Sequence, residues 1–194
     1  MLTEQQTNQA AELIWQSWRD GAVIADLPNA LRPTDRTEGY AIQAHYQTLS
    51  GQPIFGWKIA ATSAAGQQHI GVDGPIAGRL LAERVFEDGA TLAFGHNRMA
   101  VAEAEFAFLM ARDLPPRVAE YSVEEVLAAV SSLHPAIEIP DSRFQAFERA
   151  GVAQGQKGAG VVARLAKPVR NQPVHLCGGR KRCPAAGGQP VRGC

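Results

Sequence analysis

The C-terminal part of this chain lacks two classes of residue. From Val152 to Cys194 there is no acidic and no aromatic residue, whereas eight Lys or Arg, eight Gly, four Pro and all three cysteines lie there. A segment of this composition cannot bury enough apolar surface to offset the entropy of ordering its backbone, so we expect no regular structure in it. We therefore divide the chain into a patterned part, residues 1–151, with a formal charge of −8, and a basic tail, residues 152–194, with +8.

The abrupt change near residue 151 is typical of a GC-rich gene translated in a shifted frame. We interpret the tail as a frameshift product or a degenerate end. A zinc site made from His175, Cys177, Cys183 and Cys194 would need closely paired cysteines, and the sequence has no such pair. A nucleic-acid-binding arm around "GGRKRC" is the other functional reading. A free, flexible, basic tail is the default expectation.

Long apolar runs and a net charge are also absent. No stretch approaches the roughly 18 apolar residues of a membrane span. The formal net charge is zero, which argues against a nucleic-acid or membrane partner. The N-terminal residues are polar and acidic rather than a basic leader, so we expect a cytoplasmic protein.

The first 151 residues carry clear periodic patterns. Thr3 and Gln6 form a capping-box signature before an amphipathic helix over residues 4–19. Other expected elements share standard start, stop or alternation signals: a helix within residues 32–51, capped by Thr34 or Thr37 and ended by Gly51; a strand over 54–62; a turn-rich stretch over 71–80; a helix from Ser122 through Leu133; and a short strand within 134–144, ended by Pro140.

Two glutamates stand one residue apart in the apolar run "MAVAEAEFAFLMARDL". If residues 100–111 form a strand, Glu103 and Glu105 share one face, with Cα atoms roughly 6.5 to 7 Å apart, and the apolar face packs inward. Like charges at this spacing repel unless a cation lies between them, and hard divalent ions such as Mg²⁺ or Mn²⁺ prefer oxygen ligands. Glu138, on the short strand "PAIEIP", is a candidate third ligand. The alternative is a helix, in which the pair would lie about 200° apart and share no ion.

Four segments in this order resemble the fumarylacetoacetate hydrolase superfamily, and within it the 2-hydroxypentadienoate (2-keto-4-pentenoate) hydratase branch. They are "GWKIAATS", "GVDGPIAGRLL", "VAEAEFAFLMARDLP" and "HPAIEIPDSRF", and the resemblance runs from about Leu13 to Gln154. It implies an α+β (mixed) fold, a rolled β-sheet with flanking helices. Family members continue beyond this region, so we expect the sheet to be incomplete at its C-terminal end.

The resemblance also implies a chemistry. Glu103, Glu105 and Glu138 would hold Mg²⁺ or Mn²⁺, and Lys58 would serve as a proton donor or as a positive group near an enolate. Ser63 would contact the substrate carboxylate. The implied enzyme is a hydro-lyase of aromatic-compound catabolism that adds water to a 2-hydroxydienoate to give a 4-hydroxy-2-oxo acid. A homo-oligomer is expected if the chain folds. The alternative interpretations are that Lys58 is an ordinary exposed lysine and that Ser63 is an ordinary serine at the end of a strand.

Several alternatives stay open. A 2-oxo acid decarboxylase or a carbon–carbon hydrolase would share the metal ligands, and a non-catalytic remnant could persist as an interaction module. Ile76 stands where the hydratases often have an aspartate, which leaves the substrate undecided. Asp141 and Arg143 are interpreted as a local pair that orders the turn beside Glu138, and Asp73 as a turn residue.

Overall fold

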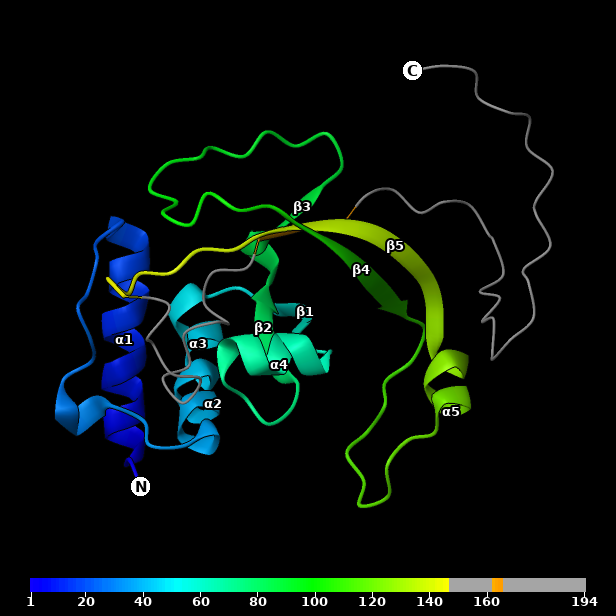
Figure 1. Ribbon diagram of the computed structural model, residues 1–194, viewed down its shortest axis with the longest axis horizontal. Helices are drawn as coiled ribbons and strands as arrows, with labels where there is room; N and C mark the ends of the chain where they lie inside the picture. The colour runs from blue at the N-terminus through cyan, green and yellow to red at the C-terminus, as the bar shows by residue number, and fades with distance from the viewer. Residues whose placement is uncertain (147–161, 166–194) are drawn as a thin grey trace. The chain divides into compact units, whose positions relative to one another are not determined.

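The computed structural model describes residues 1–146 and 162–165 (Figure 1). The chain divides into two compact units, Met1–Ala107 with His134–Lys167 and Phe108–Leu133 with Pro168–Cys194. The boundary between the units passes through strand β4 (Glu103–Met110) and strand β5 (Val130–Ile139). Within the described residues, no helix has the length and apolar character needed to cross a membrane.

Helix α1 (Glu4–Asp20) confirms the N-terminal helix and its capping box, since Thr3 accepts the Gln6 N–H and the Gln6 side chain accepts the Thr3 N–H. It ends at Gly21, whose φ of 64° is the left-handed conformation that glycine adopts without strain. One face of α1 packs into the main core of the unit. The fully buried side chains of that core include Ile14, Leu27 and Ile42.

The second expected helix is two helices, α2 (Arg36–Ala44) and α3 (Tyr46–Ser50), and α3 ends at Gly51 as predicted. The predicted cap, Thr34 or Thr37, is wrong, because Asp35 caps α2 by accepting the Glu38 N–H. The Thr34 hydroxyl instead donates to the Glu38 carboxylate at 3.0 Å. Short polar residues stand at several adjacent positions here, so sequence alone does not select among them.

Strand β1 (Ile54–Ala60) pairs antiparallel with β2 (Ile76–Leu81). Helix α4 (Ala64–Ile70) lies between them in sequence, and sequence analysis did not predict it. The turn-rich reading of residues 71–80 is wrong beyond Pro75, because Ile76 and Leu80 are buried as strand residues. Within the part of the chain that the structure describes, there are two 3₁₀ helices, η1 (Asn29–Leu31) and η2 (Ala82–Arg84).

A four-stranded sheet carries the acidic residues of interest. Its order is β3-β6-β5-β4, formed by β3 (Val85–Glu87), β6 (Val162–Leu165), β5 (Val130–Ile139) and β4 (Glu103–Met110). Strand β6 runs parallel to β3 and antiparallel to β5. The strand reading of residues 100–111 is thus correct and the helical alternative is wrong.

Within the basic tail, the structure describes residues 162–165, which form β6. These four residues form a strand although their composition predicted none, because β3 and β5 both supply backbone groups for pairing. The candidate zinc ligands His175, Cys177, Cys183 and Cys194 and the basic "GGRKRC" stretch lie outside the described residues.

In the second unit, helix α5 (Val123–Ala128) begins at Ser122, which forms the predicted capping box with Glu125. The helix ends well before Leu133, because residues 130–133 already belong to β5. Arg117 pairs with Glu125 at 2.6 Å and lies over the Tyr121 ring at 3.7 Å from its centroid. These contacts order the loop that precedes the helix.

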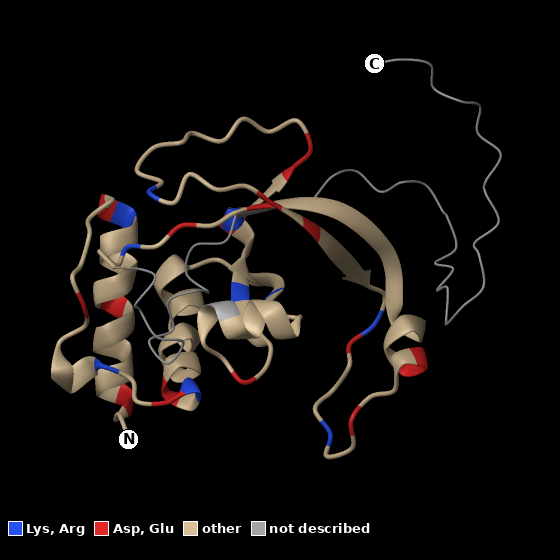
Figure 2. Ribbon diagram, in the orientation of Figure 1, with Lys and Arg blue, Asp and Glu red and all other residues tan. Residues whose placement is uncertain are grey.

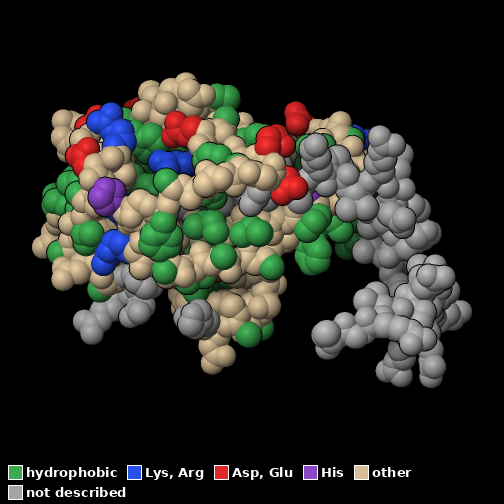
Figure 3. All heavy atoms as spheres, turned by 90° about the horizontal axis from the view of Figure 1, so that it is seen from above, with side chains coloured by type: hydrophobic (Ala, Val, Ile, Leu, Met, Phe, Trp, Pro, Cys, Tyr) green, Lys and Arg blue, Asp and Glu red, His purple; other side chains and the backbone are tan. Residues whose placement is uncertain are grey.

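The apolar face of β4 does not pack inward as expected. Phe106 is 76% exposed and Phe108 55% exposed, and apolar side chains are visible at the surface in the space-filling view (Figure 3). On β5, too, a large apolar side chain faces solvent and a charged one is covered: Ile137 is exposed, whereas Ala136 and Glu138 are buried. Alternation correctly identified the residues that share a face, but it does not determine which face is covered.

Candidate metal centre

The three predicted carboxylates converge. Glu103 and Glu105 alternate along β4 and so project from one face, and Glu138 comes from β5, the neighbouring strand of the sheet. Acidic positions are visible on both strands in the charge-coloured ribbon (Figure 2). One carboxylate oxygen from each residue lies within 4.8 Å of the others.

Burial increases across this cluster. Glu103 is exposed and Glu105 is half-buried, whereas Glu138 is only 6% exposed. The cluster is therefore reached from solvent at Glu103 and enclosed at Glu138. A buried carboxylate requires a compensating positive charge or hydrogen bonds, so Glu138 needs a partner.

Lys58 supplies that partner from β1. Its Nζ donates to Glu105 Oε1 at 2.9 Å and lies 3.0 Å from Glu138 Oε2. Gly56 and Ala60 share its face of the strand and are small, which leaves room for the long side chain. Lys58 is thus a half-buried bridge to two other strands, and with a side chain only 15% exposed it is not an ordinary exposed lysine.

The charges perturb one another. Burial raises the pKa of the Glu138 carboxyl above its usual range, the charges of Glu103 and Glu105 add to this, and Lys58 acts in the opposite direction. Burial lowers the pKa of Lys58, but its hydrogen bonds to Glu105 and Glu138 and the charges of these two residues together outweigh burial and raise it. Lys58 is therefore an ammonium at neutral pH.

The donor set fits a hard divalent cation. Mg²⁺ binds oxygen at roughly 2.0–2.1 Å, so oxygens on opposite sides of one ion lie about 4.2 Å apart. The carboxylate oxygens of the cluster all lie within 4.8 Å of one another, which is close to this value. Three carboxylates exceed the single charge of Lys58, which leaves negative charge for an ion to neutralise.

Ser63 has a different contact. Its side-chain oxygen accepts the Gly66 N–H at 3.1 Å and caps α4, so the contact seen for this residue is the helix cap. Asp141 and Arg143 form the predicted pair just after Glu138, and both are buried. Asp73 lies in a bend and pairs with Arg36.

Comparisons with known proteins show what the chain is similar to. No family model matches the chain. It is 34% identical over 146 residues to 2-keto-4-pentenoate hydratase of Paraburkholderia xenovorans, covering 74% of this chain and 54% of that protein. It is 31% identical over 137 residues to 2-hydroxyhexa-2,4-dienoate hydratase of Comamonas testosteroni, covering 68% and 51%. The chain thus spans about half the length of the relatives it matches.

A solved structure shares the fold. The 4-oxalocrotonate decarboxylase from Pseudomonas putida G7, complexed with magnesium and adipate, superimposes with a TM-score of 0.70 at 23% identity, over 85% of this chain and 64% of that one. The mixed α+β fold expected from the sequence is therefore shared with this decarboxylase. In sequence the chain is similar to the 2-keto-4-pentenoate hydratases over about half of their length.

Proposed function

We propose that Glu103, Glu105 and Glu138 bind one divalent cation, Mg²⁺ or Mn²⁺, and that the site serves a hydratase. The convergence of three carboxylate oxygens within 4.8 Å carries this proposal. The structural neighbour's complexes with magnesium and with calcium support a divalent ion, and the names of the relatives support the reaction.

The proposed reaction adds water to a 2-hydroxydienoate and gives a 4-hydroxy-2-oxo acid. With 2-hydroxypenta-2,4-dienoate, the enol proton is lost from the 2-oxygen, C5 gains a proton, and hydroxide from water bonds to C4 as the remaining proton goes to C3. The net change is one added water, and no oxidant or reductant is needed. A bound divalent ion would act as a Lewis acid that stabilises negative charge on the 2-oxygen of the substrate.

Lys58 has the properties of a proton donor in this scheme. It is positively charged at neutral pH and is held between Glu105 and Glu138, so its ammonium lies beside the proposed ligands rather than in solvent. An ammonium so placed can donate a proton or stabilise a nearby enolate. Ser63 as a contact for the substrate carboxylate stays a proposal, and its hydroxyl could donate to that group while its oxygen still caps α4.

The experiment is to incubate the chain with Mg²⁺ or Mn²⁺ and 2-hydroxypenta-2,4-dienoate and to follow loss of the dienol absorbance. We expect metal-dependent loss, with 4-hydroxy-2-oxopentanoate identified by mass, and no loss in Glu105→Gln. No turnover by a chain that binds the metal would contradict the hydratase assignment. Carbon dioxide release from a 2-oxo acid would instead favour the decarboxylase alternative, and cleavage of a carbon–carbon bond the hydrolase.

The small-molecule class of substrate follows from the relatives, which are hydratases of small unsaturated acids by name. We also propose a cytoplasmic location and a homo-oligomer, with no nucleic-acid or membrane partner. Sedimentation of the purified chain tests the oligomer. A non-catalytic interaction module is the alternative from a different class, and it predicts no specific metal binding.

A further inference from the structure

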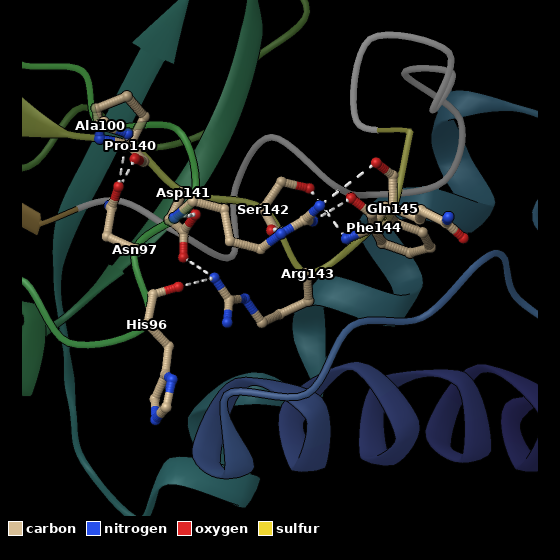
Figure 4. A network of polar contacts seen from close by, with 10 residues as sticks. His96, Asn97, Ala100, Pro140, Asp141, Ser142, Arg143, Phe144 and Gln145 are labelled. Carbon is tan, nitrogen blue, oxygen red and sulfur yellow. Dashed lines mark hydrogen bonds and ion pairs between the residues drawn. The ribbon is translucent and has the colours of Figure 1, made fainter.

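Two segments distant in sequence are tied together beside the metal centre. Residues 96–100 lead into β4, which carries Glu103 and Glu105, and residues 140–145 leave β5, which carries Glu138. Every residue of both segments belongs to the same compact unit. The contacts between them are shown in Figure 4.

The first segment donates hydrogen bonds to the second. Asn97 Nδ2 donates to the Pro140 carbonyl at 3.0 Å, and the Arg98 backbone N–H donates to Asp141 Oδ1 at 2.9 Å. The Arg98 guanidinium donates to the Phe144 carbonyl at 2.7 Å. Most of the acceptors are backbone carbonyls, so these bonds hold the path of the chain rather than one side chain.

The second segment also donates a hydrogen bond to the first, and a buried ion pair supports this contact. Arg143 Nη2 donates back to the His96 carbonyl at 2.8 Å and also pairs with Asp141. Arg143 is 2% exposed and Asp141 8%, and the Arg143 guanidinium lies 5.4 Å from the centre of the Trp18 ring. The segment is therefore anchored on the N-terminal helical layer as well.

Backbone conformation at Ala100 is consistent with a constrained junction. Ala100 has a φ of 52°, which is uncommon for a residue with a Cβ atom, and its N–H donates to Asn97 Oδ1 at 2.8 Å. Such a conformation persists where the surrounding structure determines it. Asn97 thus uses its amide to hold Pro140 and its carbonyl oxygen to hold the entry into β4.

We propose that Asn97 and Arg98 are positioning residues that set the separation of Glu138 from Glu103 and Glu105. This inference rests on the proposed metal site. Three carboxylates that repel one another lie at adjacent strand ends, Glu103 three residues after Ala100 and Glu138 two residues before Pro140. We call the hydrogen bonds between residues 96–100 and 140–145 the clamp. The clamp joins the chain just before β4 to the chain just after β5, and so it opposes the separation of these strand ends that repulsion between the carboxylates favours.

The choice of metal distinguishes positioning from general stabilisation. Mg²⁺ requires near-ideal octahedral geometry, whereas Ca²⁺ accepts six to eight oxygens at longer and more variable distances. A loosened clamp should therefore weaken Mg²⁺ binding more than Ca²⁺ binding. A residue that only stabilises the fold would affect both ions equally.

The experiment titrates Mg²⁺ and Ca²⁺ separately into the metal-free full chain by calorimetry and follows folding by circular dichroism. We expect Asn97→Ala to weaken Mg²⁺ binding about tenfold, the lower end of losses for residues that orient metal ligands, and Ca²⁺ binding less than about threefold. Asn8→Ala is the matched control, because Asn8 also donates one amide hydrogen bond, to Glu12 at 2.9 Å on the solvent-facing side of α1. It should leave both affinities unchanged.

The outcomes separate the two proposals. If the unaltered chain binds neither ion, the proposed function fails and the clamp inference with it. If the unaltered chain binds Mg²⁺ and Asn97→Ala binds both ions as before, or loses both equally, only the clamp inference is overturned. If Asn97→Ala does not fold, Arg98→Met carries the test, since it removes the guanidinium contacts and keeps the backbone bond to Asp141.

Discussion

Replacing Lys58 by methionine tests the charge balance of the site. The substitution keeps the apolar stem and removes the ammonium that contacts Glu105 at 2.9 Å and Glu138 at 3.0 Å. Glu138 then remains with a side chain 7% exposed and with two other carboxylates nearby. The folded state must either keep this charge without its partner or take up a proton.

The two routes bracket the effect on stability. Leaving one partner of a buried pair ionised costs about 3–5 kcal/mol. Protonating a carboxyl of ordinary pKa at pH 7 costs about 3.7 kcal/mol, which limits the penalty from above. The unaltered protein already bears part of these costs, because the pKa of Glu138 is raised even with Lys58 present. Water also solvates Glu105, which is 32% exposed, so the substitution adds less than the full amount. We expect Lys58→Met to lower the free energy of unfolding by about 2–3 kcal/mol at pH 7.

Urea unfolding at pH 7 in a chelator-containing buffer measures this difference, with Lys58→Arg as a control that keeps the charge. Loss of Lys58 raises the folded pKa of Glu138 further above its unfolded value. The loss of stability in Lys58→Met is therefore complete at high pH, and it disappears as the pH falls through the pKa of Glu138 in the folded state toward its pKa in the unfolded state. The difference in unfolding free energy between Lys58→Met and the unaltered chain should thus narrow from pH 7 to about pH 4. Equal stability of Lys58→Met and the unaltered chain at pH 7 would refute the reasoning.

Two further predictions concern the surrounding fold. Hydrogen bonds to the buried Glu38, of which the one from the Thr34 N–H has the largest effect, lower the pKa of its carboxyl from 4.5 to about 2. In urea unfolding, the unaltered chain should therefore be more stable than Glu38→Gln by a constant amount above pH 4.5, and this difference should fade as the pH falls toward 2. A difference that does not depend on pH would contradict this. Gly21→Ala should be destabilising by about 1 kcal/mol more than Gly51→Ala in thermal unfolding, since both have positive φ but only at Gly21 would a Cβ meet a side chain, His96, at 2.5 Å. Equal losses would show that His96 moves away freely.

Local patterns predicted the parts of the site that depend on a single strand. The alternation of Glu103 and Glu105 placed both on one face, and Glu138 joined them as expected. Capping residues were predictable where one hydroxyl stood alone, as at Thr3 and Ser122, and not where several competed, as around Asp35.

Contacts between residues far apart in the sequence could not be predicted from local patterns. The contacts of Lys58 reach Glu105 and Glu138 on other strands, and alternation along β1 shows only the side to which Lys58 points. The exposure of Phe106 depends on which face of β4 is covered, which its own sequence does not specify. Asn97 acts largely on a backbone carbonyl, and because every residue has one, no side-chain pattern indicates that contact.

The central claim is that Glu103, Glu105 and Glu138 form one divalent-metal site. Its most direct test is calorimetric titration of Mg²⁺ into metal-free chain, compared with Glu105→Gln and with Glu12→Gln, at an exposed position of α1, as the control. We predict a single site whose affinity falls at least about tenfold in Glu105→Gln, the smallest loss expected even for a residue that only orients a ligand, and is unchanged in Glu12→Gln. Absence of Mg²⁺ binding, or binding that Glu105→Gln leaves intact, would contradict the account.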